Sequence, residues 1–136
     1  MMNSEQIKQL VFFAGAIGLS IFMLFFVIAA TWIGFDVKSK CREAKSEYGG
    51  DCTEAMMGLL NDESRGFRAR NSAIWVLGQL GEGRALPVLQ NYYTGNIPPR
   101  EPLDEAISQY ELKKAINLAG GGLNITAFFW RYGLDE

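Results

Sequence analysis

Residues 10–35 read LVFFAGAIGLSIFMLFFVIAATWIGF and contain no charged side chain. A helix needs about 20 apolar residues to cross the hydrocarbon core of a bilayer, and a helix also satisfies its own backbone polar groups there. The apolar region of a cleaved signal peptide is only about 7–15 residues long and is followed by a small-residue cleavage site. The sequence therefore predicts an uncleaved, single-pass transmembrane helix over residues 10–35, after a tail over residues 1–9.

Two pairs of small residues stand four positions apart in this run, Ala14 with Gly18 and Ala30 with Gly34. This spacing lets the backbones of two membrane helices approach closely. Alanine and glycine are also common in any membrane helix, so the spacing alone leaves both interpretations open. The four residues are candidates for a transmembrane helix contact, and Trp32 fits the aromatic belt at a membrane surface.

The whole chain has 136 residues, with 13 Lys and Arg against 15 Asp and Glu, no His and two Cys. A net charge of −2 gives no electrostatic case for nucleic acid as a partner. Without His, no imidazole is present for catalysis or for metal binding. We therefore expect no cofactor, no metal and no catalytic residue, and residues 36–136 are long enough for one small hydrophobic core.

Glycine and proline divide the rest of the chain into helical segments. Sustained alternation of polar and apolar residues is missing, so strands are not expected. Asp51 is a predicted N-cap, and three of the four prolines fall in a predicted loop over residues 94–102. Helices are predicted over residues 36–48 (running out of the membrane to a turn at 49–50), 52–62, 67–80, 84–93 and 103–119. The expected fold class is all-α, with antiparallel helices packed in layers.

A weak internal repeat of about 30 residues relates residues 53–80 to residues 84–119. Residues 68–81, RARNSAIWVLGQLG, followed by residues 84–89, RALPVL, resemble a HEAT-type repeat, and they are similar to the bacterial HEAT-like repeats first noted in phycobilisome lyases. The family pattern is an Arg before an Ala-rich helix that ends in A-x-x-x-L-G-x-L-G, then a helix of the A-L-P-x-L kind. The residues that match it are Arg70, Ala73, Leu77, Gly78, Leu80, Gly81, Ala85, Leu86 and Leu89.

The resemblance implies a short α-solenoid of helical hairpins over residues 51–123, because stacked repeats bury faces that one hairpin leaves open. The chain as a whole is also similar to small bacterial membrane-anchored proteins with a HEAT domain. An Arg such as Arg68 or Arg70 near a helix start often braces the turn between repeat helices through backbone carbonyls or a carboxylate. Binding of a ligand or partner is the other interpretation of these two residues.

Cys41 and Cys52 are either a disulfide or two unrelated thiols, because a zinc site needs more ligands. A helix from Cys41 to Tyr48 would carry Cys41 about 10–12 Å from the following turn. A disulfide requires Cα atoms within about 7 Å. We therefore expect that a bridge requires the first helix to fray or tilt.

Residues 124–136 form a predicted aromatic C-terminal cap, with four candidate interaction residues: Phe128, Phe129, Trp130 and Tyr132. These side chains either close the open end of the last helix pair or form an exposed patch for a partner or for the membrane surface. The sequence alone supports both interpretations.

The expected function is that of a non-enzymatic, membrane-anchored interaction or scaffold protein, an accessory or assembly subunit of a membrane complex. The alternatives are a subunit that acts through its transmembrane helix and a lyase-like HEAT-repeat enzyme. The expected partners are the lipid bilayer of a bacterial cytoplasmic (inner) membrane and another protein or membrane complex. Basic residues after the span favour a cytoplasmic domain, whereas the cysteine pair suits an oxidising compartment, and we favour the extracytoplasmic side.

Overall fold

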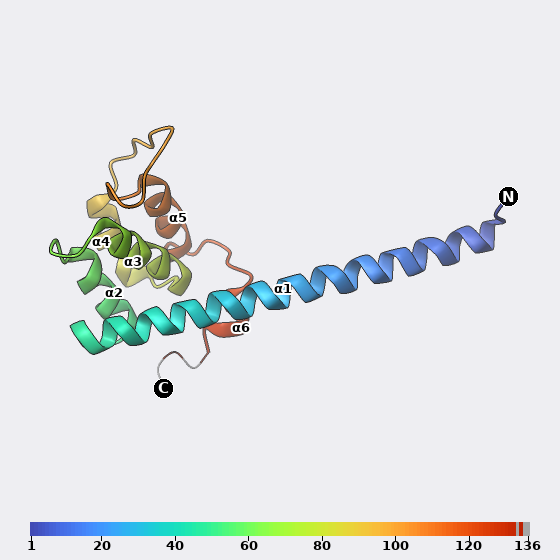
Figure 1. The fold of residues 1–136 in the computed structure, drawn as a ribbon, viewed down its shortest axis with the longest axis horizontal. Helices are drawn as coiled ribbons and strands as arrows, with labels where there is room; N and C mark the ends of the chain where they lie inside the picture. The colour runs from blue at the N-terminus through green and yellow to red at the C-terminus, as the bar shows by residue number, and fades with distance from the viewer. Residues whose placement is uncertain (133, 135–136) are drawn as a thin grey trace.

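The computed structural model describes residues 1–132 and 134. The predicted all-α class is confirmed, since this part of the chain contains helices and no strand. Residues 133, 135 and 136 of the predicted cap lie outside the described residues. The elements are α1 (Ser4–Tyr48), α2 (Cys52–Asn61), α3 (Phe67–Leu80), the 3-10 helix η1 (Gly83–Ala85), α4 (Leu86–Tyr92), α5 (Gln109–Ala119) and α6 (Ala127–Trp130), as Figure 1 shows.

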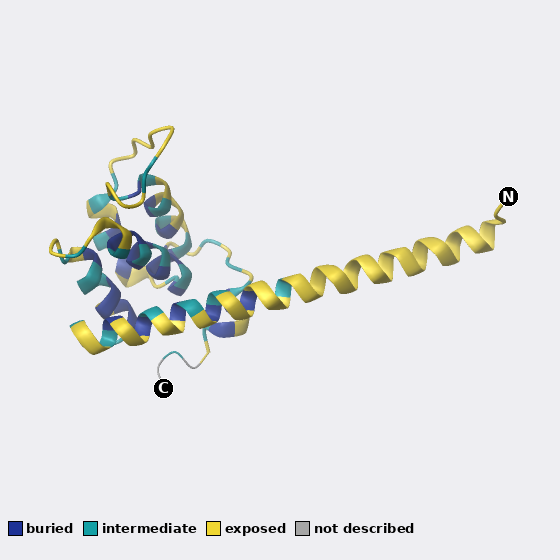
Figure 2. Cartoon of the chain, viewed as in Figure 1, coloured by how far each residue is buried: buried dark blue, intermediate teal, exposed yellow. Residues whose placement is uncertain are grey.

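Helix α1 is 45 residues long, or about 67 Å at 1.5 Å per residue. It begins at Ser4, so most of the predicted tail is helical, because Asn3 and Gln6 form a capping box at its start. The N-terminal half extends away from the other helices and is exposed (Figure 2). This one helix is long and apolar enough to cross a membrane.

The C-terminal half of α1 is part of the hydrophobic core rather than a linker. Its buried residues, Ala30, Gly34, Val37, Cys41 and Ala44, are spaced by three or four positions and therefore lie along one face of the helix. This stripe starts inside the apolar run, at Ala30. The folded domain and the predicted span therefore overlap along α1.

The helical domain is built around α3, which packs against both α2 and α5, while α2 also packs against α1. Large, fully buried side chains come from α1 to α5 and include Val37, Met56, Leu60, Ile74, Leu77, Leu89 and Leu112. Gly78 permits the close approach of α3 and α5, since a Cβ there would lie 2.9 Å from the Cα of Ala115. The glycine predicted from the repeat resemblance thus has a packing role.

Two predicted helix boundaries are confirmed by local chemistry. The side chain of Asp51 accepts a hydrogen bond from the Glu54 amide at 2.9 Å, and the Glu54 side chain bonds back to the Asp51 amide. Helix α3 has the predicted bounds and ends at Gly81, whose φ of 68° lies in the left-handed region that favours glycine.

The predicted helix over residues 103–119 is wrong in its first six residues, because α5 begins at Gln109. The buried side chain of Asn71 on α3 donates to the carbonyls of Leu103 and Ala106 at 2.9 and 2.8 Å. Its oxygen accepts from the Ser108 amide at 2.8 Å. These bonds hold residues 103–108 outside the helical conformation.

The predicted helix over residues 84–93 is also divided. Residues Gly83–Ala85 form η1, and α4 follows over Leu86–Tyr92, with Pro87 in its first turn where a missing N–H is tolerated. Residues 93–108 carry no regular helix, which confirms and extends the predicted loop.

The C-terminal segment returns from α5 to α1, where α6 packs (Figure 1). Arg131 fixes this return by donating from Nε and Nη2 to the Gln79 carbonyl of α3, at 3.0 and 2.7 Å. The segment therefore packs beside α1 and the end of α3. It does not simply close the last helix pair, as one of the two interpretations of the aromatic cap supposed.

Candidate functional site

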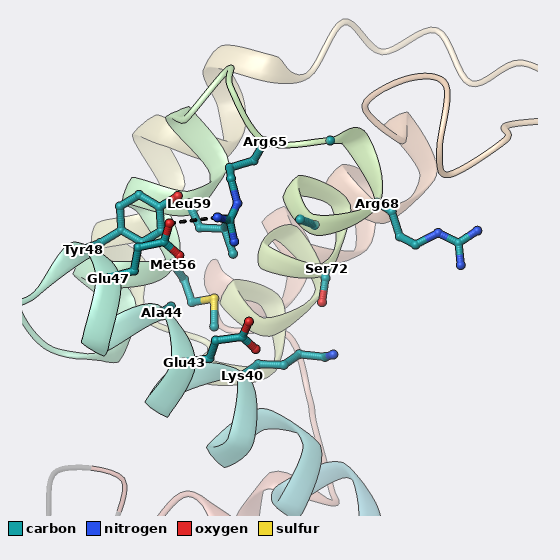
Figure 3. Close-up of a pocket in the computed structure, with 12 residues that line it drawn as sticks. Lys40, Glu43, Ala44, Glu47, Tyr48, Met56, Leu59, Arg65, Arg68 and Ser72 are labelled. Atoms are coloured by element: carbon teal, nitrogen blue, oxygen red, sulfur yellow. Dashed lines mark hydrogen bonds and ion pairs between the residues drawn. The ribbon is translucent and has the colours of Figure 1, made fainter.

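A groove of about 490 Å³ lies between α1 and α3 (Figure 3). Helices α1 and α3 each pack against α2 but barely touch one another, so a channel remains open between them. We call this channel the α1–α3 groove. Its lining comprises Lys40, Glu43, Ala44, Glu47, Tyr48, Met56, Leu59, Arg65, Gly66, Arg68, Ala69 and Ser72.

The helical period determines which side chains line the two walls. On α1, Lys40, Ala44 and Glu47 are four and three positions apart and therefore share a face. On α3, Arg68 and Ser72 share a face in the same way. Between these walls the floor of the groove is apolar, because α2 contributes Met56 and Leu59 there.

The groove continues along α1 towards the apolar run. A second hollow of about 320 Å³ shares Lys40, Arg68 and Ser72 with the first, and adds Trp75 of α3 and Leu103 of the loop between α4 and α5. The two hollows therefore form one continuous surface along α1 and α3. Its apolar residues are flanked by side chains of both charges.

One end of the groove is closed by an ion pair, since Arg65 Nη1 lies 2.8 Å from Glu47 Oε1 (Figure 3). Further along α1, Lys40 pairs with Asp36 at 3.4 Å. Arg68 takes part in no ion pair within the described part of the chain and points outward from α3 in Figure 3. It is thus available for a carboxylate from outside.

Tyr48 and Asp62 join α1 to the end of α2 at this closed end. The Tyr48 hydroxyl donates to Asp62 Oδ2 at 2.6 Å, and this hydrogen bond raises the pKa of Tyr48 to about 12. Ser64 donates to Asp62 Oδ1 from its hydroxyl at 2.6 Å and from its amide at 3.0 Å. The bonds from the Ser64 hydroxyl and then from Tyr48 lower the pKa of Asp62 below its usual value.

We expect the stabilising effect of Asp62 to depend on pH. Because its pKa is lower in the folded chain than in the unfolded chain, its contribution is complete above the ordinary value of 3.8 and is lost as the pH falls through the folded value. Asp62→Asn should therefore lower the stability of the full chain in detergent micelles at pH 7, and less so near pH 3. Urea unfolding followed by circular dichroism measures this.

The matched control for this experiment is Glu63→Gln, which changes the neighbouring, exposed carboxylate. Its effect on stability should be small at both pH values. A difference between the wild type and Asp62→Asn that is the same at pH 7 and pH 3 would contradict the role of the Asp62 hydrogen bonds.

The two arginines singled out in the sequence have different positions. Arg70 is buried, and its Nε donates to the Leu60 carbonyl at 2.8 Å while its guanidinium lies near the rings of Phe67 and Tyr92. Arg70 therefore has the geometry predicted for an arginine that braces the turn between two helices through a backbone carbonyl. Arg68 is exposed and lines the groove, so of these two arginines only Arg68 exposes its charge at the surface.

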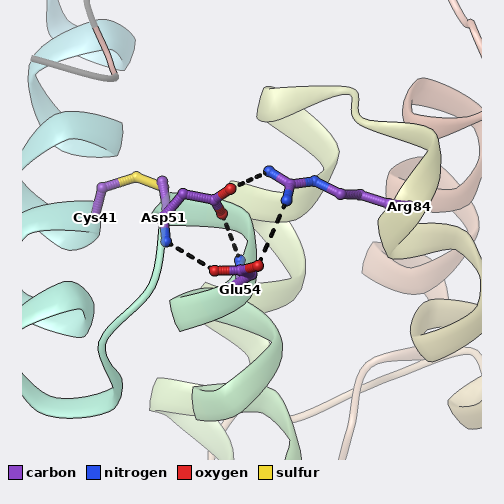
Figure 4. Close-up of a disulfide and its surroundings, with 5 residues drawn as sticks. Cys41, Asp51, Glu54 and Arg84 are labelled. Carbon is purple, nitrogen blue, oxygen red and sulfur yellow. Dashed lines mark hydrogen bonds and ion pairs between the residues drawn. A yellow bond between two sulfur atoms is a disulfide. The ribbon is translucent and has the colours of Figure 1, made fainter.

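A disulfide joins Cys41 and Cys52, whose Cα atoms are 5.1 Å apart (Figure 4). Of the two expected ways to reach a bridge, fraying or tilting of the first helix, fraying does not occur, because α1 continues unbroken to Tyr48. Residues 49–51 instead run back along the helix, with Gly49 and Gly50 at φ of 71° and 72°. Four residues of extended chain reach up to about 13 Å, which is enough to recover the seven residues of helix after Cys41.

A charged cluster lies beside the disulfide (Figure 4). The Asp51 carboxylate accepts from the Glu54 amide, which is the main reason that the pKa of Asp51 is lowered, and it also pairs with Arg84. The pair between Arg84 and Asp51 links η1 to the start of α2. Arg84 also pairs with Glu82, which directly precedes η1. The cluster explains how the short η1 is positioned.

The small residues of the apolar run also separate into two groups. Gly18 has no neighbouring side chain around its Cα, and Ala14 is exposed. Ala30 and Gly34 are buried under α6, where a side chain at Gly34 would collide with Trp130. The second pair thus contacts a helix of its own chain rather than a separate membrane helix.

The aromatic residues of the C-terminal segment divide in the same way. Trp130 is buried against α1, whereas Phe128, Phe129 and Tyr132 are each more than half exposed. One aromatic side chain of the segment is therefore buried against α1, and three are exposed.

Sequence reasoning missed the α1 wall of the groove, because residues 36–48 were interpreted only as a helix that leaves the membrane. The apolar stripe of Val37, Cys41 and Ala44 was the available signal.

Within the described residues, no group of three or more His, Cys, Asp or Glu side chains is placed to hold a metal ion. Comparisons of the chain with protein-family models, curated proteins and solved structures find no match.

Proposed function

We propose that this protein is a non-enzymatic, membrane-anchored interaction protein that serves a membrane complex as an accessory or assembly subunit. Helix α1 anchors it in a bacterial cytoplasmic membrane, and the HEAT-like helical domain presents the α1–α3 groove to a partner. The observation that carries the proposal is the groove itself, in which two helices flank an apolar floor.

The shape of the groove suits a helix of the partner. An amphipathic helix binds by laying its apolar face into such a groove, and Met56 and Leu59 supply the apolar surface here. Arg68 on one rim and Glu43 on the other offer charges of opposite sign, which would fix the orientation of a bound helix. The resemblance of residues 68–89 to HEAT-type repeats supports this proposal, because such repeats are scaffolds for partners.

We place the helical domain on the extracytoplasmic side. The disulfide between Cys41 and Cys52 supports this side, since disulfides persist in oxidising compartments and are rare in the cytosol.

A substitution that fills the groove tests the proposal. Ala69 is half-buried in the α3 wall, so Ala69→Trp places a large ring in the groove without removing a core side chain. We expect the amount of stoichiometric partner that co-purifies with the tagged full chain in mild detergent to fall at least about tenfold. A loss of about 1.4 kcal/mol in binding free energy is enough to weaken the affinity tenfold. Lys113→Trp, on the exposed surface of α5, is the matched control and should retain the partner.

A second candidate function rests on the exposed part of α1. Residues 4–25 are exposed and include Ala14 and Gly18, a pair that allows close packing of a foreign membrane helix. Gly18→Leu should abolish co-purification if the span binds the partner. If Gly18→Leu removes the partner and Ala69→Trp does not, the groove proposal is wrong and the span carries the function.

A further inference from the structure

The C-terminal segment carries several exposed apolar side chains beside the apolar run of α1. In residues 123–132, five large apolar or aromatic side chains are more than half exposed: Leu123, Ile125, Phe128, Phe129 and Tyr132. On the adjoining part of α1, Trp32 and Phe35 are also exposed, at 73% and 74%. Exposed apolar surface of this extent on a small domain indicates an interaction site.

Contacts with α1 fix how far this segment reaches along the predicted span. The rings of Phe129 and Phe26 pack edge to face, with centroids 5.4 Å apart. Phe26 lies nine residues before Phe35, or about 13 Å deeper in the apolar run. The segment therefore does not stop where the apolar run ends but lies alongside its last third.

The length of the apolar run then sets the depth of α6 in a bilayer. The charged pair Lys8 and Glu5, 2.8 Å apart, precedes the run. A hydrocarbon core of about 30 Å takes about 20 helical residues, so a core that starts after Lys8 ends near residue 28 at the earliest. Helix α6 packs on Ala30 and Gly34. It therefore lies either at the boundary of the hydrocarbon core or inside the core.

The backbone of the segment favours the boundary over the hydrocarbon core. Residues 120–126 form no helix, and backbone groups without a hydrogen-bond partner are strongly disfavoured in hydrocarbon. Aromatic side chains are enriched at the boundary, where both apolar and polar surroundings are available. Lys38, one turn beyond Gly34, borders a crevice of about 310 Å³ between α1 and α6 and is placed for the phosphate level of the lipids.

We propose that residues 123–132 form a second membrane-contacting element, whose exposed apolar side chains insert at the boundary between lipid headgroups and hydrocarbon in the leaflet where α1 leaves the bilayer. The inference rests on the anchoring role of α1 proposed above. Two contacts with the same leaflet would fix the tilt of the helical domain and hence the direction in which the α1–α3 groove faces.

Spin labels on single introduced cysteines test the depth of this segment. The full chain, with Cys41 and Cys52 in their disulfide, is reconstituted in phosphatidylcholine vesicles. Labels are placed at Phe128→Cys, with Tyr132→Cys as a second, independent site. Collisions of each label with oxygen, which concentrates in lipid, are compared with collisions with a water-soluble nickel chelate.

Phe22→Cys in the span and Lys113→Cys on α5 are the reference sites for lipid and water. We expect the ratio of oxygen to nickel accessibility at residues 128 and 132 to exceed that at residue 113 by at least about fivefold, as for a side chain that lies about 5–10 Å into the boundary. The unsubstituted chain should take up no label.

Each other result has a separate meaning. Water-like labels at residues 128 and 132 with a lipid-like label at residue 22 overturn the inference and leave the anchor intact. A water-like label at residue 22 overturns the anchor itself, and the inference with it. Labels at residues 128 and 132 that are shielded from both reagents indicate a protein contact, such as a second copy of the chain, and also overturn the lipid assignment.

Discussion

Leu77→Ala should lower the free energy of unfolding of the full chain by about 2–5 kcal/mol, the range for truncation of a fully buried leucine. Leu77 is 0% exposed and lies in α3, the helix that packs against both α2 and α5. The surrounding helices cannot all collapse onto the cavity, because α3 contacts α5 through the close approach at Gly78. The measurement is denaturant unfolding in detergent micelles, followed by circular dichroism.

Trp75→Ala provides a comparison within the same helix. Trp75 is half-buried and faces the hollow beside the α1–α3 groove, so its truncation should cost only about 1–2 kcal/mol. Lys113→Ala, an exposed change on α5, should stay within about 0.5 kcal/mol of the wild type. A loss below about 0.5 kcal/mol for Leu77→Ala would contradict the packing of α3.

The double substitution Cys41→Ser and Cys52→Ser should lower the free energy of unfolding by about 3 kcal/mol. The disulfide closes a loop with a sequence separation of 11. Without this constraint the unfolded chain gains conformational entropy, which stabilises the unfolded state by about 3 kcal/mol. Both sulfur-bearing residues are also buried, so the polar replacement adds to the loss. Unfolding in detergent micelles with and without a reductant measures the effect.

The double variant is its own control for the reductant. Reduction should destabilise the wild type and leave the double variant unchanged, and equal effects on both would show that the bridge contributes nothing. Thiol trapping in intact cells extends the test to the proposed location. Free thiols in untreated cells would contradict an oxidising, extracytoplasmic environment.

Helix positions were predictable where local chemistry decides them. The bounds of α3 follow from the periodic apolar residues of residues 67–80 and from Gly81, and the start of α2 follows from the capping side chain of Asp51. These signals lie within a few residues of the feature that they determine. A capping hydrogen bond or a left-handed glycine acts on the neighbouring turn of helix, so the sequence alone was sufficient.

The start of α5 has one local signal that was missed in the sequence, because the Ser108 hydroxyl accepts from the Glu111 amide at 3.1 Å and caps the helix. Residues 103–108 are in addition held outside the helix by Asn71, a buried side chain more than 30 positions earlier in the chain. The position of residue 109 at the helix start is reinforced by Glu101, which accepts from its amide at 2.6 Å. Bonds between distant segments exist only once the helices have packed.

By itself the sequence determined that the protein is helical, that residues 10–35 are apolar enough to cross a bilayer, and where most helices begin and end, because these properties depend on adjacent residues. Only the tertiary structure decided that α1 forms one wall of a groove, that Cys41 meets Cys52 beside an unbroken helix, and that α6 returns to Ala30 and Gly34. Each of these requires segments far apart in the chain to meet. Such meetings are selected by the burial of apolar surface over the whole domain, which no local pattern encodes.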